Sequence, residues 1–195
     1  ETGSGKTLAY ALPAMHHIKS LEIAGDAITL SARPRALVVV PTRELGEQVT
    51  KAFKPFTHTT RLRVRSVLGG TTTEVAKRGL AGAFEILVAT PGRLVQMLER
   101  RLVDLDDVRM LILDEADQMM DLGFIVPLKR VANMLPKERQ SLFFSATMPK
   151  AIAELGKQFI SNPVRVEVTP QATTAERVDQ FITYVNQAEK QALLS

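Results

Sequence analysis

The most constraining stretch of this 195-residue chain is a short apolar run that ends in two adjacent carboxylates. Met110–Leu113 contains four apolar residues without polar alternation, which is typical of a strand buried on both faces of a parallel sheet. Asp114 and Glu115 follow directly. Because ionised carboxylates at the end of a buried strand are costly without a partner, the sequence predicts a cation beside them. A hydrated Mg²⁺ suits this position, since one or two carboxylates and substrate phosphates usually hold it.

A glycine-rich stretch at the start of the chain is chemically suited to bind such phosphates. Its backbone amides would face the phosphates, Lys6 would reach the outer ones, and Thr7 would offer its hydroxyl to Mg²⁺. The helix expected at residues 6–21 would add its positive N-terminal end. The alternative interpretation is a glycine turn that only caps this helix. The full loop pattern needs a residue before Glu1, so we expect a truncated chain. The six residues expected to surround the phosphates are Thr2, Gly3, Ser4, Gly5, Lys6 and Thr7.

Other apolar runs of strand length recur along the chain, separated by helix-like stretches. Such alternation predicts an α/β fold, in which a parallel sheet is flanked by helices on both faces. Polar residues follow most of these strands, and a parallel sheet would gather them at one edge. The expected strands, besides the run before Asp114, are residues 35–40, 62–68, 84–89, 140–144 and 164–168.

The groups expected at this edge suit the hydrolysis of a nucleotide. In phosphoryl transfer the protein mainly positions the phosphates and neutralises their charge, which Lys6, Thr7 and a metal on Asp114 would do. Glu115 is placed to orient or deprotonate the attacking water. We therefore expect Lys6, Asp114 and Glu115 to be catalytic, with Thr7 and Asp114 as metal ligands. The alternative for Glu115 is a surface carboxylate paired with an arginine.

Arginines and glycines follow three further strand ends. Arg43 could contact a phosphate beside a helix N-terminus, although an arginine–glutamate pair that only caps the helix explains it as well. Thr90 and Pro91 suit the N-cap and the first position of a helix, which accounts for both residues but leaves Arg93 unexplained. The glycine pair ending at Gly70 predicts a turn with exposed amides, which suits a phosphodiester backbone.

The composition is that of an ordinary globular protein, with a formal charge of +4 that weakly favours a polyanionic partner. Arg61, Arg63 and Arg65 alternate along one expected strand and therefore share a face. A solvated edge strand explains this pattern as well as a nucleic acid does. The sequence contains no cysteine, which excludes disulfides and thiolate chemistry. No apolar run approaches the ~18 residues of a membrane span.

Six stretches resemble, in the same order, the motifs of one family. They are Thr2-Gly-Ser-Gly-Lys-Thr7, Pro41-Thr-Arg-Glu-Leu45, Gly69-Gly70, Thr90-Pro-Gly-Arg93, Asp114-Glu-Ala-Asp117 and Ser145-Ala-Thr147. The chain is similar to the first RecA-like domain of the DEAD-box ATP-dependent RNA helicases. The resemblance implies a RecA-like helicase domain over residues 1–168, a linker over 169–177 and the beginning of a second domain over 178–195. That last segment resembles the bacterial RhlE-like kind.

The resemblance implies ATP and Mg²⁺ as cofactors and RNA as the partner, contacted through its backbone. It also implies a cytoplasmic monomer, with ribonucleoprotein or RNA-decay proteins as further partners and no membrane. This part alone is expected to bind nucleotide weakly and to have negligible activity. The residues that the family assigns to RNA are Pro41, Thr42, Arg43, Gly69, Gly70, Thr90, Pro91, Gly92 and Arg93. Those that would couple hydrolysis to strand separation are Asp117, Ser145, Ala146 and Thr147.

Two other functions remain open from the sequence. One is an RNA clamp that has lost turnover, and the intact Lys6, Asp114 and Glu115 argue against it. The other is a P-loop motor that acts on DNA or protein, which the combined motifs disfavour.

Overall fold

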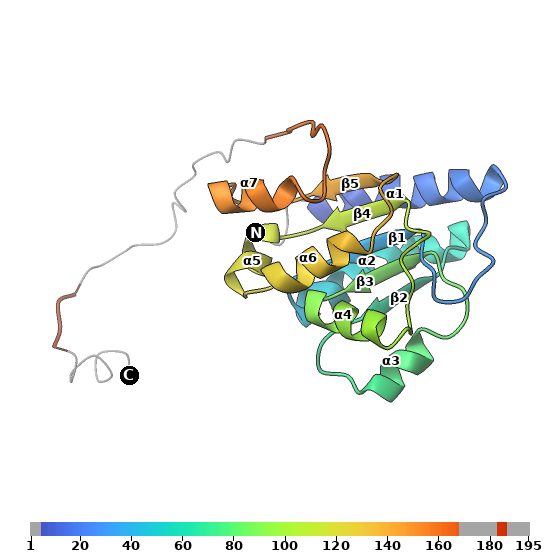
Figure 1. Cartoon of the computed structure of the whole chain (residues 1–195), viewed down its shortest axis with the longest axis horizontal. Helices are drawn as coiled ribbons and strands as arrows, with labels where there is room; N and C mark the ends of the chain where they lie inside the picture. Colours follow the sequence, from blue (N-terminus) through green and yellow to red (C-terminus); the bar gives the residue numbers. More distant parts are fainter. Residues whose placement is uncertain (1–4, 168–182, 187–195) are drawn as a thin grey trace. The chain divides into compact units, whose positions relative to one another are not determined.

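The computed structural model describes residues 5–167 and 183–186. Within these ranges the strands form one five-stranded parallel sheet in the order β2-β3-β1-β4-β5 (Figure 1). The strands are β1 (Ala36–Val39), β2 (Val64–Val67), β3 (Ile86–Ala89), β4 (Met110–Leu113) and β5 (Gln140–Phe143).

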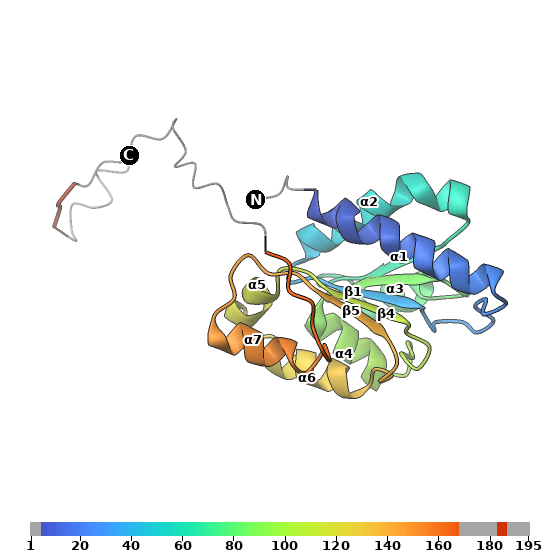
Figure 2. The same cartoon turned by 90° about the horizontal axis from the view of Figure 1, so that it is seen from above.

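Helices cover both faces of this sheet, which confirms the predicted fold class. One face carries α1 and α2, and the other carries α4, α5, α6 and α7 (Figure 2). The helices are α1 (Lys6–Ile23), α2 (Arg43–Thr60), α3 (Thr73–Gly79), α4 (Pro91–Glu99), α5 (Ala116–Asp121), α6 (Ile125–Asn133) and α7 (Lys150–Gly156).

The two cores explain why the central strands lack polar alternation. Along β1, Leu37 and Val39 pack into the core under α4 and α6, whereas Ala36 and Val38 pack into the core under α1 and α2. All four side chains are fully buried. Because successive side chains of a strand point to opposite faces, a strand covered on both sides must be apolar at every position.

The carboxyl ends of the strands all lie at one edge of the sheet, called the carboxyl edge below, because every pairing is parallel. Backbone hydrogen bonds continue the ladder one residue past the strands. The amide of Asp114 donates to the carbonyl of Val39 at 3.0 Å, and the amide of Thr90 donates to that of Val67 at 3.2 Å. These bonds fix the first polar residue after β4 and β3 at the edge.

One predicted strand is wrong. Residues 164–168 were expected to close the sheet, but their described part, 164–167, has no strand partner. The side chains of Val164 and Val166 are 90% and 84% exposed, and Arg165 pairs with Glu167 at 3.0 Å. The alternation of this segment is that of a strand, but a strand forms only where a neighbour accepts its backbone hydrogen bonds.

The chain divides into two compact units, residues 1–162 and 163–195. The predicted linker over 169–177 lies outside the described residues, and so does most of the expected second domain, so that division stays a prediction. In the part of the chain that the structure describes, no helix is both long enough and apolar enough to cross a bilayer.

Candidate active site

Asp114 is the buried centre of the carboxyl edge. Its residue is 4% exposed, and its Oδ2 accepts a 3.0 Å hydrogen bond from the hydroxyl of Tyr10 on α1. The amide of Glu115 donates to its Oδ1, also at 3.0 Å. Burial raises the pKa of Asp114, and the hydrogen bonds from Tyr10 and the Glu115 amide, together with the charge of Lys6, oppose that rise without cancelling it. Because burial disfavours the charged form of this carboxylate, a cation bound beside it would stabilise the charge.

Tyr10 is a site residue that the sequence analysis missed. It is 1% exposed, and its ring packs against Phe144 with the ring centroids 5.4 Å apart. Burial, and then the charge of Asp114, raise the pKa of Tyr10 far above its ordinary value, so the phenol remains a donor. One feature of the sequence indicates a role at the site: Tyr10 follows Thr7 by three residues, so both side chains lie on one face of the helix.

The start of α1 brings the phosphate-loop residues to Asp114. The side chain of Thr7 lowers the pKa of Tyr10, against the larger effect of burial, and the charge of Lys6 lowers the pKa of Asp114. Gly5 precedes the helix with φ 71°, a left-handed conformation that glycine adopts without steric cost. The first turn of α1 therefore faces the same end of the sheet as Asp114, and the binding roles of Lys6 and Thr7 stay predictions. Thr2, Gly3 and Ser4 lie outside the described residues.

The donors present fit Mg²⁺. Thr7 and Asp114 supply a hydroxyl and a carboxylate, and Mg²⁺ prefers oxygen ligands, keeps several waters and shares phosphates with its substrate. Within the described residues, no group of three or more His, Cys, Asp or Glu side chains could hold a metal. A single hydroxyl and a single carboxylate match a hydrated ion that is held jointly with phosphates.

Glu115 follows Asp114 in an unusual backbone conformation. Its φ and ψ are both 53°, in the left-handed region, where it forms the N-cap of α5. A non-glycine residue in this region costs on the order of 1–3 kcal/mol, and such costs are typical of functional sites. The turn starts α5 immediately after β4 and leaves the Glu115 side chain partly exposed beside the buried Asp114.

Asp117 joins the ends of β4 and β5. Its Oδ2 accepts hydrogen bonds from the amide of Thr147 at 2.9 Å and from its hydroxyl at 3.0 Å. The Asp117 amide donates to the hydroxyl of Ser145 at 3.3 Å, and that hydroxyl donates to the Thr147 carbonyl at 2.7 Å. The three predicted coupling residues therefore form one network. The fourth, Ala146, lies between them in the chain and is exposed.

This network gives Asp117 a pH-dependent role in stability. Burial alone raises the pKa of Asp117, but the hydrogen bonds from Thr147, Gln118 and Ser145 outweigh it and hold the pKa below its ordinary value. A depressed folded-state pKa stabilises the fold at pH values above the unfolded value of about 3.9, and this contribution is lost as the pH falls through the folded-state value.

We expect Asp117→Asn to lower the free energy of unfolding by about 1 kcal/mol at pH 7, because the neutral amide accepts weaker hydrogen bonds than the carboxylate. Urea unfolding at pH 7 and below pH ~3.9 measures the effect, which should shrink in acid. Asp121→Asn, at an exposed position on the same helix, is the matched control. An equal destabilisation at both pH values would contradict this assignment.

Two predicted RNA residues approach each other at the carboxyl ends of β1 and β2. Gly70 has φ 80°, and a Cβ atom added there would lie 2.8 Å from Nη1 of Arg43. Arg43 also pairs with Glu47 at 2.8 Å, one helical turn away. The expected arginine–glutamate pair therefore exists, yet it leaves the guanidinium against the glycine turn. Thr42 caps α2, its hydroxyl accepting from the amide of Leu45 at 3.2 Å.

A third predicted stretch joins the same turn. Nη2 of Arg93 donates to the carbonyl of Thr71 at 2.9 Å, and Nη1 donates to Gln96. Thr90 is the N-cap of α4 and Pro91 its first residue, as predicted, but the Thr90 hydroxyl makes no capping hydrogen bond. The remaining predicted RNA residues belong to the same segments. They are the buried Pro41 and Pro91, and Gly69 and Gly92.

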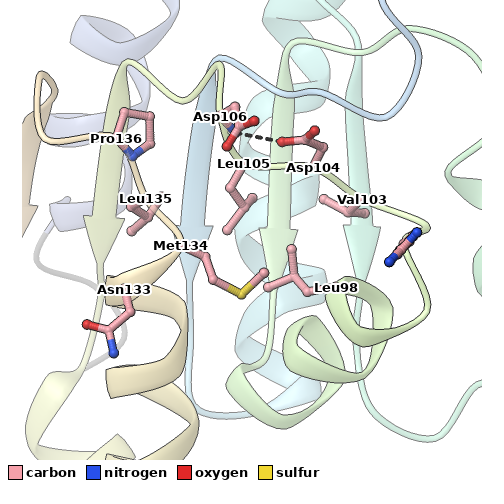
Figure 3. Close-up of a pocket in the computed structure, with 10 residues that line it drawn as sticks. Leu98, Val103, Asp104, Leu105, Asp106, Asn133, Met134, Leu135 and Pro136 are labelled. Carbon is pink, nitrogen blue, oxygen red and sulfur yellow. Dashed lines mark hydrogen bonds between the residues drawn. The ribbon is translucent and has the colours of Figure 1, made fainter.

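The amino ends of the strands carry a separate cavity of about 740 Å³ (Figure 3). Apolar side chains of Leu98 and Met134 line it together with Asp104 and Asp106, whose amide donates to Asp104 at 2.8 Å. No predicted site residue belongs to its lining. The catalytic candidates therefore gather at the carboxyl edge alone.

Comparison with known proteins agrees with this geometry. Residues 1–155 match the family model described as DEAD/DEAH box helicase. The chain belongs to this family. The chain is 39% identical over 190 residues to the DEAD-box ATP-dependent RNA helicase CshA of Streptococcus pneumoniae, and 40% identical over 185 residues to the RNA helicase CrhR of Synechocystis. The predicted family resemblance is confirmed.

A solved structure gives the same result for the fold of this helicase-family chain. The crystal structure of the yeast DEAD-box splicing factor Prp28 superposes with a TM-score of 0.72 at 33% identity, over 83% of this chain and 38% of that one. The matches to CshA and CrhR cover 97% and 95% of this chain but only 34% and 36% of those proteins. The chain thus spans about a third of the length of these relatives.

Proposed function

We propose that this chain is the ATP-binding part of an ATP-dependent RNA helicase, which couples ATP hydrolysis to local RNA unwinding or ribonucleoprotein remodelling. The observation that carries the proposal is that Asp114 accepts a hydrogen bond from Tyr10 on α1, the helix that begins with Lys6 and Thr7, and that the charge of Lys6 acts on Asp114. A phosphate loop and a metal-binding carboxylate at one sheet edge are the two parts that nucleotide hydrolysis needs. The names of CshA and CrhR support RNA as the substrate class.

Each residue has a separate task in this proposal. Lys6 neutralises the outer phosphates, and Thr7 and Asp114 hold Mg²⁺. When bound there, Mg²⁺ would neutralise negative charge on the phosphates. Tyr10 donates to Asp114 and keeps its Oδ2 oriented. Glu115 accepts a proton from the attacking water or orients that water.

RNA binding is proposed for the part of the carboxyl edge that follows β1, β2 and β3. Arg43, Gly70 and Arg93 come from three separate segments and lie around one glycine turn. Their guanidinium groups and exposed amides suit phosphate oxygens, which carry no sequence information. The network of Asp117, Ser145 and Thr147 links β4 to β5 and is the proposed connection between hydrolysis and RNA. We also propose a cytoplasmic monomer with ribonucleoprotein or RNA-decay partners, as the family resemblance implies.

ATP hydrolysis with and without single-stranded RNA tests this function. The measurement uses this chain joined to a complete second helicase domain, with single-stranded DNA as the control nucleic acid. We expect strong stimulation by RNA and little by DNA. Equal rates with and without RNA would favour a different P-loop ATPase, and RNA binding without hydrolysis would favour a clamp.

The 195 residues alone provide a second test. We expect weak nucleotide binding and negligible hydrolysis, because the chain spans about a third of its relatives. Robust RNA-stimulated hydrolysis by these residues alone would show that they contain a complete catalytic site.

A further inference from the structure

A second group of cations lies at the end of α2 remote from Arg43, and the proposed function does not use it. Lys54, Arg61, Arg63 and Arg65 line an open groove of about 930 Å³, called the basic groove below. It forms where the C-terminus of α2 meets the amino end of β2. The 18 residues of α2 span about 27 Å at 1.5 Å per residue. The basic groove is therefore a surface distinct from the carboxyl edge.

Most of these cations have no anionic partner. In the described part of the chain, Arg63 pairs with Glu85 at 2.6 Å, but Lys54, Arg61 and Arg65 form no ion pair. The groove lining contains no carboxylate. The carboxylates that raise the pKa of Arg63 are Glu85 and Glu22, and neither belongs to the lining. These cations consequently produce an uncompensated positive potential.

The arginines before β1 behave differently. Arg33 lies at the amino ends of the strands too, but it pairs with three aspartates, Asp104, Asp106 and Asp107, at 3.1–3.6 Å. Arg33 is therefore neutralised by aspartates, whereas three of the four cations of the basic groove form no ion pair within the described residues.

The shape and chemistry of the groove favour a phosphate backbone over a protein. Its apolar residues are Leu62, which is only 2% exposed, and the half-buried Val64, so the groove offers no large aromatic or aliphatic anchor of the kind that protein interfaces use. The exposed groups are guanidinium and ammonium groups together with the side chains of His58 and Thr59. Such groups supply most contacts to phosphate oxygens in protein–nucleic acid complexes.

We propose that the basic groove is a second RNA-binding surface, which holds the backbone of RNA that extends beyond the carboxyl edge and does not read its sequence. The choice of RNA rests on the proposed function, whereas the charge of the groove does not. The competing explanation is that the cations protect β2, an edge strand, from pairing with another chain.

Fluorescence anisotropy of a long labelled single-stranded RNA, titrated with the full chain at several salt concentrations, tests the proposal. The variant is R61E/R65E, and the matched control is K129E/K137E, which reverses two exposed charges on and after α6, on the other face of the sheet. We expect R61E/R65E to bind at least ~10-fold more weakly at 0.1 M salt, and its log–log salt slope to be shallower by about 1.4, for two lost phosphate contacts. The control should stay within about twofold, as these side chains contact no RNA.

Four results would overturn the proposal. RNA affinity and salt slope of R61E/R65E equal to those of the wild type would leave strand protection as the role of these cations. Displacement of RNA by poly-glutamate at equal charge concentration would assign the groove to acidic proteins. An equal loss of RNA affinity in K129E/K137E would mean that the net charge of the protein, and not the groove, determines RNA binding. Absence of RNA binding by the wild-type chain would remove this surface and the RNA part of the proposed function together.

Arg93→Glu separates the two RNA surfaces. Loss of binding in Arg93→Glu but not in R61E/R65E would support the carboxyl edge and overturn the basic groove. The reverse result would support the groove and contradict the proposed RNA face. Losses in both variants are expected if one RNA contacts both surfaces.

Discussion

Replacement of Glu115 with glutamine is expected to lower RNA-stimulated ATP hydrolysis by about 10²–10⁴-fold, the usual contribution of a positioned general base. Glutamine has nearly the same shape as glutamate but cannot accept the proton of the attacking water. Asp114 and Lys6 stay in place in this variant, so nucleotide and RNA binding should be retained. The assay uses this chain joined to a complete second helicase domain, with equilibrium binding of nucleotide and RNA measured beside the rate.

Glu138→Gln is the matched control for Glu115→Gln. Glu138 is exposed and forms no ion pair within the described residues. Its substitution should leave the rate unchanged. Hydrolysis above a tenth of the wild-type rate in Glu115→Gln would contradict the proposed role of this carboxylate.

The backbone of Glu115 allows an independent check. Its left-handed conformation is unfavourable for every residue with a side chain. Glutamate and glutamine therefore have the same conformational cost here, and Glu115→Gln should leave the free energy of unfolding unchanged. Glu115→Gly should raise the free energy of unfolding by about 1 kcal/mol, because glycine adopts this conformation without steric cost. If Glu115→Gly loses activity and gains stability, Glu115 is a residue that the protein retains for its chemistry and not for its fold.

Replacement of Tyr10 with alanine is expected to lower the free energy of unfolding by about 3–5 kcal/mol, as for other buried aromatic residues. Tyr10 is 1% exposed and lies between the ring of Phe144 and the carboxylate of Asp114. Its removal would leave a cavity between α1 and the sheet and a buried carboxylate without its hydroxyl donor. Since domains are stable by about 5–15 kcal/mol, this is a large fraction of the total. Urea unfolding of the 195-residue chain measures the change.

Two further variants separate the ring from the hydroxyl. Tyr10→Phe keeps the packing but removes the donor to Asp114, so we expect a smaller loss of about 1–3 kcal/mol. Leu12→Ala, on the same helix, truncates a side chain that is 47% exposed and should change stability by less than about 0.5 kcal/mol. A Tyr10→Phe variant as stable as the wild type would mean that the hydrogen bond to Asp114 makes no net contribution.

Local sequence determined the type of most elements. Met110–Leu113 is apolar at every position because helices cover both faces of the sheet, and its bounds are those of β4. Thr90 and Pro91 occupy the N-cap and first position of α4 as predicted, and for Pro91 the cause is local, since its fixed φ suits the first helical residue. The order of the motifs was also sufficient to indicate the family.

Contacts between distant segments were decided only by the tertiary structure. The hydrogen bond from Tyr10 to Asp114, the approach of Gly70 to Arg43 and the bond from Arg93 to Thr71 each join separate βα units. No periodicity encodes them, because strand order and side-chain packing place these residues together.

The remaining differences have the same physical cause. The alternating segment 164–168 resembles a strand, but strand formation requires a neighbour with free backbone groups, and its described part has none. The alternating arginines Arg61, Arg63 and Arg65 fitted a solvated edge or a nucleic acid equally well. Only the structure showed that Arg63 is paired and that the other two lie without a carboxylate in one groove. The sequence by itself thus determined elements whose causes are local, whereas pairing and the neutralisation of charge depend on residues far apart in the chain.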